Sequence, residues 1–78
     1  LEGLFLYHTK VTDSGLVHLK GLTNLQFLDL SGTKVTDAGL EHLKGLTSLQ
    51  IHGLYDTQVT DEGVKKLQQA LPNCVISR

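Results

Sequence analysis

The chain repeats itself at a fixed interval. The tripeptide Val-Thr-Asp occurs at residues 11–13, 35–37 and 59–61, so its threonines are 36 − 12 = 24 and 60 − 36 = 24 residues apart. A period of this size is typical of stacked units, because each unit is too small to bury its apolar face without a neighbour. The 78 residues therefore predict a single domain, residues 1–78, built as a row of similar short units.

Most of the other apolar, glycine and threonine positions follow the same period. The aligned columns are Leu1, Leu25 and Leu49; Leu4 and Leu28; Leu6 and Leu30; Thr9, Thr33 and Thr57; Gly15, Gly39 and Gly63; and Leu16, Leu40 and Val64. They divide the chain into repeats at about 1–24, 25–48 and 49–70, with a closing strand at 71–78. Because the last unit shortens into a polar end while the first opens on core leucines, we expect the C-terminal part of a longer array.

Each unit is predicted to contain a short strand, a turn and a helix. The strand cores are expected at residues 4–6, 28–30, 52–54 and 74–76. Alternation along a strand sends the first and third residue of each core inward. This pattern buries His52 and Cys74 next to each other, unless the third strand shifts so that Ile51 turns inward instead. The recurring threonine of the turn is expected to hydrogen-bond the turn backbone.

The helix signals also recur in register. The threonine of each Val-Thr-Asp tripeptide is expected to cap a helix, and the aspartate to lie at the positive end of the helix dipole. Gly21 and Gly45 are expected to end the first two helices. The glycine column at 15, 39 and 63 lowers helix propensity. Its recurrence indicates that neighbouring units pack too closely there for a Cβ atom.

Residues 11–16, Val-Thr-Asp-Ser-Gly-Leu, and residues 35–40, Val-Thr-Asp-Ala-Gly-Leu, carry a family resemblance. With the leucines before them they resemble the leucine-rich-repeat family, closest to its cysteine-containing class of F-box adaptors and bacterial repeat proteins. The 24-residue period is nearer to the bacterial form, and the class often has Cys or Asn at the places held here by Thr9, Thr33 and Thr57. The resemblance implies protein partners and an α/β fold: a right-handed solenoid with a parallel β-sheet on its concave face and short helices on its convex face.

The outward positions of the predicted strands form the surface that solenoids use for binding. Both Phe and both Tyr residues of the chain fall on these positions rather than on inward ones. The expected binding residues on the concave face are Phe5, Tyr7, His8, Phe27, Asp29, Ser31, Ile51, Tyr55 and Asp56. Clustered exposed aromatic residues favour a protein contact. The alternative is that these rings only pack on one another across the strands.

Catalytic or metal chemistry is not indicated by the remaining residues. A buried pair of Cys74 and His52 would be held neutral and would lack a third member. His18 and His42 align on the helix side, but Lys66 interrupts their column, so they do not make a metal site. We expect no catalytic residue, no metal and no cofactor, and the chain is not expected to be an enzyme.

Charge and hydropathy narrow the class of partner. The formal net charge is −1, which gives no basic surface for nucleic acid, and no apolar run is long enough for membrane insertion. We expect a non-catalytic protein-binding module. The alternatives are a structural spacer in a larger multidomain protein and the substrate-recognition segment of a ubiquitin-ligase adaptor. The uncapped N-terminal end, which begins at Leu1 and Leu4, predicts either further repeats upstream or self-association with a second copy of the chain.

Overall fold

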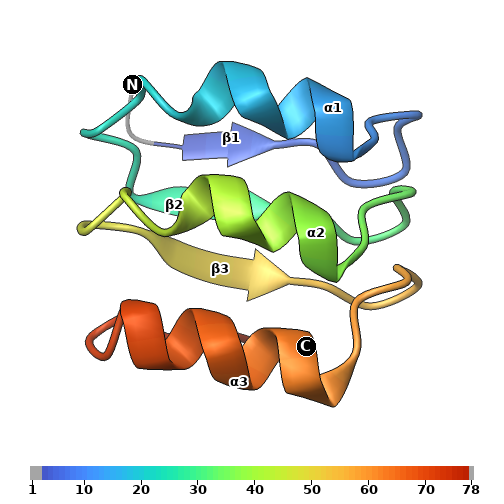
Figure 1. Ribbon diagram of the computed structural model, residues 1–78. Helices are drawn as coiled ribbons and strands as arrows, with labels where there is room; N and C mark the ends of the chain where they lie inside the picture. The colour runs from blue at the N-terminus through green and yellow to red at the C-terminus, as the bar shows by residue number, and fades with distance from the viewer. Residues whose placement is uncertain (1–2, 78) are drawn as a thin grey trace.

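The computed structural model describes residues 3–77, so the expected role of Leu1 in opening the first repeat lies outside it, as does the last residue of the expected closing strand. Strands and helices alternate along the chain (Figure 1). The elements are β1 (Gly3–Phe5), α1 (Asp13–Leu16), a 3-10 turn (Val17–Leu19), β2 (Phe27–Asp29), α2 (Asp37–Leu40), a 3-10 turn (Glu41–Leu43), β3 (Gln50–Gly53) and α3 (Asp61–Ala70).

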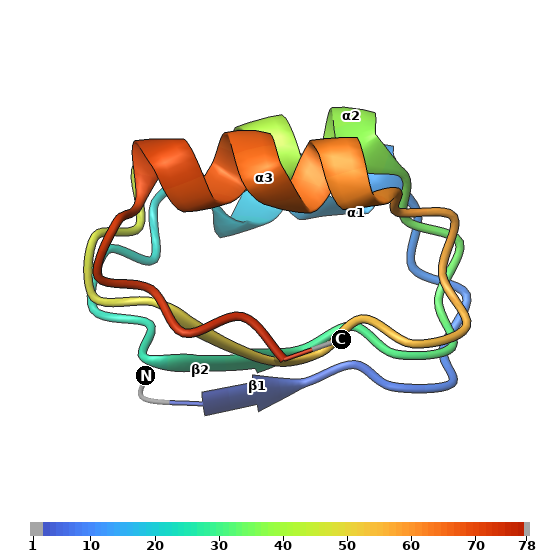
Figure 2. The same ribbon diagram turned by 90° about the horizontal axis from the view of Figure 1, so that it is seen from below.

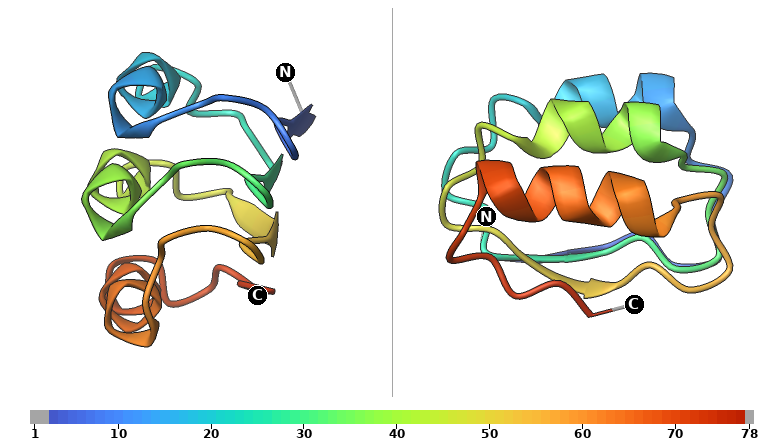
Figure 3. Two further views of the ribbon diagram at one scale, coloured as in Figure 1. Left: turned by 90° about the vertical axis from the view of Figure 1, so that its right-hand side faces the viewer. Right: turned by 60° about the horizontal axis from the view of Figure 1, so that its bottom comes forward.

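The strands and helices form two layers. The sheet has the order β1-β2-β3 with parallel pairing, in the register Leu4↔Leu28 and Leu28↔Ile51. All three helices lie on one side of the sheet, as the views from below and from the end show (Figures 2 and 3). The expected α/β solenoid, with a parallel sheet along one side and short helices along the other, is confirmed.

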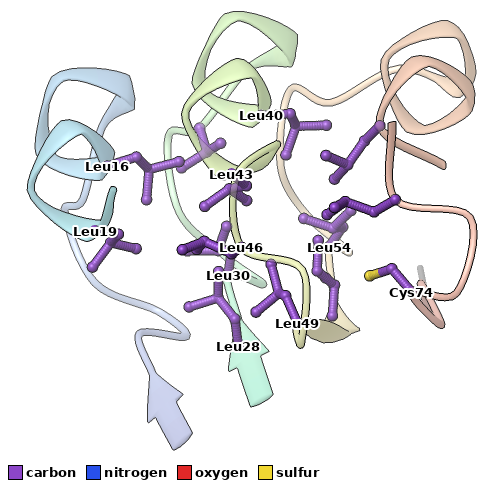
Figure 4. Packing of buried hydrophobic residues seen from close by; sticks show 14 of the residues in the cluster. Leu16, Leu19, Leu28, Leu30, Leu40, Leu43, Leu46, Leu49, Leu54 and Cys74 are labelled. Atoms are coloured by element: carbon purple, nitrogen blue, oxygen red, sulfur yellow. The ribbon is translucent and has the colours of Figure 1, made fainter. Parts of the chain in front are cut away.

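The core fills the space between the two layers. Leucines from the strands meet leucines from the helices there, and Leu28, Leu30 and Leu43 are fully buried (Figure 4). The first repeat is less well covered, because Leu4 and Leu6 are only partly buried although they belong to the same columns as Leu28 and Leu30. The inward face of β1 is therefore the more open end of the core.

Successive repeats are joined by aspartate side chains at the helix starts. Asp13 accepts a hydrogen bond from the backbone N–H of Thr36 at 2.7 Å on Oδ1 and one from the Thr36 hydroxyl at 2.5 Å on Oδ2. Asp37 makes the same two bonds with Thr60, at 2.7 and 2.5 Å. Hydrogen bonds to a carboxylate are stronger than those between neutral groups. We call this arrangement the Asp–Thr ladder. The aspartates were expected only to stabilise their own helices through the helix dipole, and the ladder shows that they also join each repeat to the next.

The glycine column makes room for the ladder. A Cβ atom on Gly39 would collide with Asp13 Oδ1 and would lie 3.0 Å from Leu16 Cδ1. A Cβ atom on Gly63 would collide with the carboxylate of Asp37 in the same way. The prediction that neighbouring units pack too closely for a side chain is confirmed at these two positions. At Gly15 it is wrong for the described residues, since a Cβ there would meet only Val11 Cγ1, at an ordinary 3.6 Å.

The threonines cap the helices as expected, although not all through their side chains. Thr12, Thr36 and Thr60 are the N-cap residues of α1, α2 and α3. The hydroxyl of Thr36 accepts from the N–H of Ala38, and that of Thr60 accepts from the N–H of Gly63. The hydroxyl of Thr12 instead lies 3.1 Å from the Ser14 hydroxyl. The capping prediction is therefore confirmed in position at all three helices and in side-chain bonding at two.

The threonines of the turns form the predicted hydrogen bonds, whereas Gly21 and Gly45 do not end the helices in the predicted way. The hydroxyls of Thr9, Thr33 and Thr57 donate to the carbonyls of Leu6, Leu30 and Leu54, at 2.6, 2.7 and 2.6 Å. The threonine column thus bonds the turn backbone, as predicted. The helical segments do end just before Gly21 and Gly45, but neither glycine has the positive φ of a left-handed helix terminator; among the described glycines only Gly32 does.

The third strand corrects the predicted inward placement of His52. The pairing of β2 with β3 runs Leu28↔Ile51 and then Asp29↔Gly53, so His52 is an extra residue at a bulge. Ile51 is fully buried and His52 is exposed. Burying an imidazole costs free energy unless it is hydrogen-bonded, whereas Ile51 gains from burial, and a bulge lets the strand exchange the two. The structure therefore confirms the alternative expectation, in which the third strand shifts and Ile51 turns inward.

The closing segment is shorter than a strand. Ile76 forms a single parallel bridge with Ile51, whose N–H donates to the Val75 carbonyl at 2.9 Å. The amide of Gln68, on α3, donates to the carbonyls of Leu71 and Cys74 at 3.0 and 2.7 Å and ties this segment to the last helix. The expected closing strand is reduced to this bridge because the segment passes Pro72, which has no N–H to donate, and a turn.

Burial of Cys74 predicts a specific dependence of stability on pH. Cys74 is 6% exposed, and burial raises the pKa of its thiol above the ordinary value, an effect that a backbone hydrogen bond from Ile51 partly offsets. The folded chain then holds the thiol proton more tightly than the unfolded chain. The stabilising contribution of the protonated thiol is complete below the ordinary pKa of cysteine and is lost as the pH rises through the higher folded-state pKa.

Urea unfolding of the wild-type chain and of a Cys74→Ala variant between about pH 7.5 and 10.5 measures this effect. We expect the free energy of unfolding to fall more steeply with pH in the wild type, because the variant has no thiol to titrate. Parallel curves for the two proteins would contradict it.

Candidate functional site

The outward side of the sheet, away from the helices, is the candidate site, and we call it the sheet face. Its described residues are Gly3, Phe5, Tyr7, His8, Phe27, Asp29, Gln50, His52, Gly53, Tyr55 and Asp56. Three aromatic side chains on it are more than half exposed: Phe5 at 58%, Tyr7 at 53% and Tyr55 at 53%. Exposed rings this large, gathered on one side of a small protein, are unusual unless they meet another molecule.

A group of three rings lies where the strands run into the turns. The His8 ring stands edge-on to Tyr7, with centroids 5.9 Å apart, and edge-on to Tyr55, with centroids 6.2 Å apart. His8 is held with φ at 56°, in the left-handed region, at the position where the second repeat has Gly32. A Cβ atom on Gly32 would meet the His8 ring at 2.5 Å. Glycine at position 32 therefore lets His8 lie across the middle repeat between the two tyrosines.

Two residues expected on this surface are buried rather than exposed. Ser31 is fully buried, and its hydroxyl lies against the backbone of Gly53 in the next repeat. Ile51 is fully buried because the bulge at His52 turns it into the core. Their expected exposure on the sheet face is wrong. The same bulge places His52 on the sheet face, where its ring stands edge-on to Phe27 at 5.0 Å.

Asp29 lies in the middle of the sheet face and is half-buried. The register places it between Phe5 on β1 and Gly53 on β3. Its Oδ1 atom accepts a hydrogen bond from the Ser31 N–H at 3.0 Å. A Cβ atom on Gly53 would collide with Ser31 Oγ and lie 2.8 Å from Asp29 Oδ1. The bare backbone of Gly53 is therefore what allows the carboxylate and the hydroxyl to lean toward the third repeat.

Asp56 lies at the edge of the sheet face. It is exposed, and its φ of 55° again lies in the left-handed region, where Asp is better tolerated than most residues. Of the residues expected on this face, two are half-buried, namely Phe27 and Asp29. The exposed ones are Phe5, Tyr7, His8, Tyr55 and Asp56. His52 is not among the binding residues expected on this face; only the alternative of a shifted third strand, suggested by a polar residue at a core position, places it there.

The residues that could support chemistry do not come together. Cys74 is buried while His52 is exposed on the opposite side of the sheet backbone, so the pair considered from the sequence does not form. Within residues 3–77, no group of three His, Cys, Asp or Glu side chains is placed to hold a metal ion. No helix in that range is long and apolar enough to cross a bilayer.

Stacked strand–helix units of this kind make the chain a solenoid, an architecture in which each repeat packs only on its neighbours. Residues 21–44 match the family model described as Leucine Rich repeat, which spans the end of the first repeat and most of the second. The match supports a leucine-rich repeat family, whose repeats are typically non-catalytic binding modules. No curated protein and no solved structure matches the chain.

Proposed function

We propose that this chain is a non-catalytic protein-binding module that holds its partner on the sheet face. The observation that carries the proposal is the exposure of Phe5, Tyr7 and Tyr55 on one side of the sheet, each above half. A role in the core does not account for these rings, because the core is filled by leucines on the other side of the same strands. We further propose that the repeats are of the cysteine-containing type, on the strength of residues 35–40.

The composition of the surface fits protein recognition better than small-molecule binding. Aromatic residues provide most of the binding free energy in many protein interfaces, where a few side chains near the centre dominate. The strands are paired with one another, and the His8 ring makes edge-on contacts with Tyr7 and Tyr55, which limits the side-chain entropy that these rings lose on binding.

Triple substitution of Phe5, Tyr7 and Tyr55 by serine tests the proposal. These side chains are exposed, so the fold should survive, and partner capture should be abolished because the apolar contact area is gone. Proteins retained by the immobilised wild-type chain and by the variant are compared by quantitative mass spectrometry. The matched control is Val17→Ser, which removes an apolar side chain that is 43% exposed on the helix side and should leave capture unchanged. An unchanged set of partners in the triple variant would favour a spacer role.

A further inference from the structure

We propose that the sheet face recognises a cationic side chain of its partner, an arginine guanidinium, at Asp29. This inference rests on the proposed function and names the chemistry of the partner group. It is carried by a half-buried carboxylate with one free oxygen, a buried hydroxyl beside it that has no partner, and exposed aromatic rings on both sides.

The carboxylate has unused bonding capacity. Within the described residues, Asp29 makes a single hydrogen bond, from the Ser31 N–H to Oδ1, and no ion pair. Its Oδ2 atom therefore has no donor among residues 3–77. A half-buried carboxylate is only partly hydrated, so it gains strongly from a cationic donor that can approach it.

A second observation places an unmet polar group at the same point. The Ser31 hydroxyl oxygen is fully buried and has no hydrogen-bond partner. It lies next to the backbone of Gly53, where Asp29 Oδ1 also lies. Such unpartnered buried groups are rare in native proteins and call for a specific explanation. A guanidinium held by Asp29 brings several N–H donors to this part of the surface.

The surroundings favour a cation rather than an anion or a neutral group. Phe5 lies beside Asp29 on β1, while Tyr7 and Tyr55 occupy the next outward positions on either side of the middle repeat. Aromatic faces attract cations, and guanidinium groups also stack on them. Among the residues of the sheet face there are two carboxylates, Asp29 and Asp56, and no lysine or arginine. A basic group on the partner therefore meets attraction without a competing positive charge.

Arginine fits this arrangement better than lysine. Its planar guanidinium can stack on a tyrosine or phenylalanine ring while its N–H groups point at a carboxylate in the same plane. A lysine ammonium is more strongly hydrated and makes a point contact only. The lysines of this chain that the structure describes lie outside the strands, at residues 10, 20, 34, 44, 65 and 66, so none of them occupies the site from a strand position.

NMR titration of the isotope-labelled chain with blocked tripeptides tests this assignment. The probes are acetylated and amidated Gly-Arg-Gly, Gly-Lys-Gly and Gly-citrulline-Gly; citrulline keeps the shape of arginine without its charge. We expect saturable shifts at Asp29, Gly53 and Tyr55 with the arginine peptide, weaker binding of the lysine peptide and none of the citrulline peptide. Saturable binding of citrulline equal to that of arginine would overturn the proposal.

Two single substitutions separate a local contact from a general charge effect. Asp29→Asn keeps the oxygen that accepts from Ser31 and removes the charge, and it should raise the dissociation constant of the arginine peptide about tenfold, as expected for one charge-assisted contact. Glu62→Gln removes the same charge from an exposed residue on the helix side and should change the constant less than about twofold. Equal effects of the two substitutions, or no effect of Asp29→Asn, would overturn the proposal. The unperturbed spectrum of each variant verifies its fold.

Failure of this inference is distinguishable from failure of the proposed function. If the arginine peptide does not bind but the triple serine variant still loses its partners, the sheet face binds by apolar contact alone and the role of Asp29 is wrong. If the triple variant keeps its partners while the arginine peptide binds at Asp29, the cation site stands and the aromatic contact surface is wrong. Equal binding of the lysine and arginine peptides would keep the cation site and overturn the preference for guanidinium.

Discussion

Alanine at Gly39 should lower the free energy of unfolding by about 2–4 kcal/mol, whereas alanine at Gly15 should raise it by about 0.5–1 kcal/mol. The two glycines occupy the same place in successive repeats, each near the start of a short helix. Alanine is a better helix former than glycine at both positions. The opposite signs arise only from what the new methyl group meets.

At Gly39 the methyl group would occupy the space of the Asp13 carboxylate, which is bonded to Thr36. Either the ladder breaks and leaves donors unpaired at the start of α2, or the two repeats move apart and open the core. Both outcomes cost more than the gain in helix propensity. At Gly15 the same methyl group would find only Val11 at a normal distance, so the gain in propensity remains.

Urea unfolding of both variants, followed by circular dichroism, measures the two free energies. Gly63→Ala, which would collide with Asp37, is a second test of the same effect in case the Gly39 variant does not fold. If Gly15→Ala destabilises as strongly as Gly39→Ala, the cost lies in the helix itself and the Asp–Thr ladder is not its cause.

Leu28→Ala should destabilise the chain by about 3–4 kcal/mol, and Leu4→Ala in the same column by about half as much. Leu28 is fully buried between the neighbouring repeats, so its truncation removes apolar contacts and leaves a cavity among packed leucines. Leu4 is only partly buried at the open end of the core, where solvent already reaches it. A truncated side chain there loses less burial and leaves a space that opens to water.

Urea unfolding measures the free energy of unfolding of both variants. Because a domain of this size has only a few kcal/mol of stability, Leu28→Ala can fail to fold, and Leu28→Val is the milder substitution to measure in that case. Equal losses at Leu4 and Leu28 would show that the first repeat is covered in solution, for example by a second copy of the chain. Repeating the experiment at several protein concentrations separates these cases, since coverage by another copy makes the stability of the first repeat depend on concentration.

The architecture was predictable because its signals are periodic and redundant. Three copies of Val-Thr-Asp, with leucines in register, give the unit length, the helix starts and the inward columns. The Asp–Thr ladder could not be predicted in the same way. The recurrence of Asp13 and Asp37 was visible, but whether a carboxylate bonds its own helix or the next repeat depends on the distance between helices, which only the packing sets.

The sheet face was predictable in outline and not in detail. Alternation placed the aromatic rings correctly, because strand geometry depends on local chemistry. It failed for Ile51 and His52, where two neighbouring residues competed for one buried position and a bulge settled the competition. It failed for Ser31 in another way: an outward place in the alternation predicts exposure, but this small residue is fully buried and its hydroxyl lies against the Gly53 backbone.

The Asp–Thr ladder has a consequence for how such a chain lengthens over generations. The junction of the first and second repeats is chemically the same as that of the second and third, since each joins an aspartate to the threonine of the following unit. An in-frame tandem duplication of residues 25–48 would set Asp37 of one copy against Thr36 of the next, and Gly39 would again leave the space that the carboxylate needs. On the helix side the new junction would therefore need no compensating mutation, whereas on the sheet face Asp29 of the added copy would stand where Gly53 now leaves room for Asp29 and Ser31.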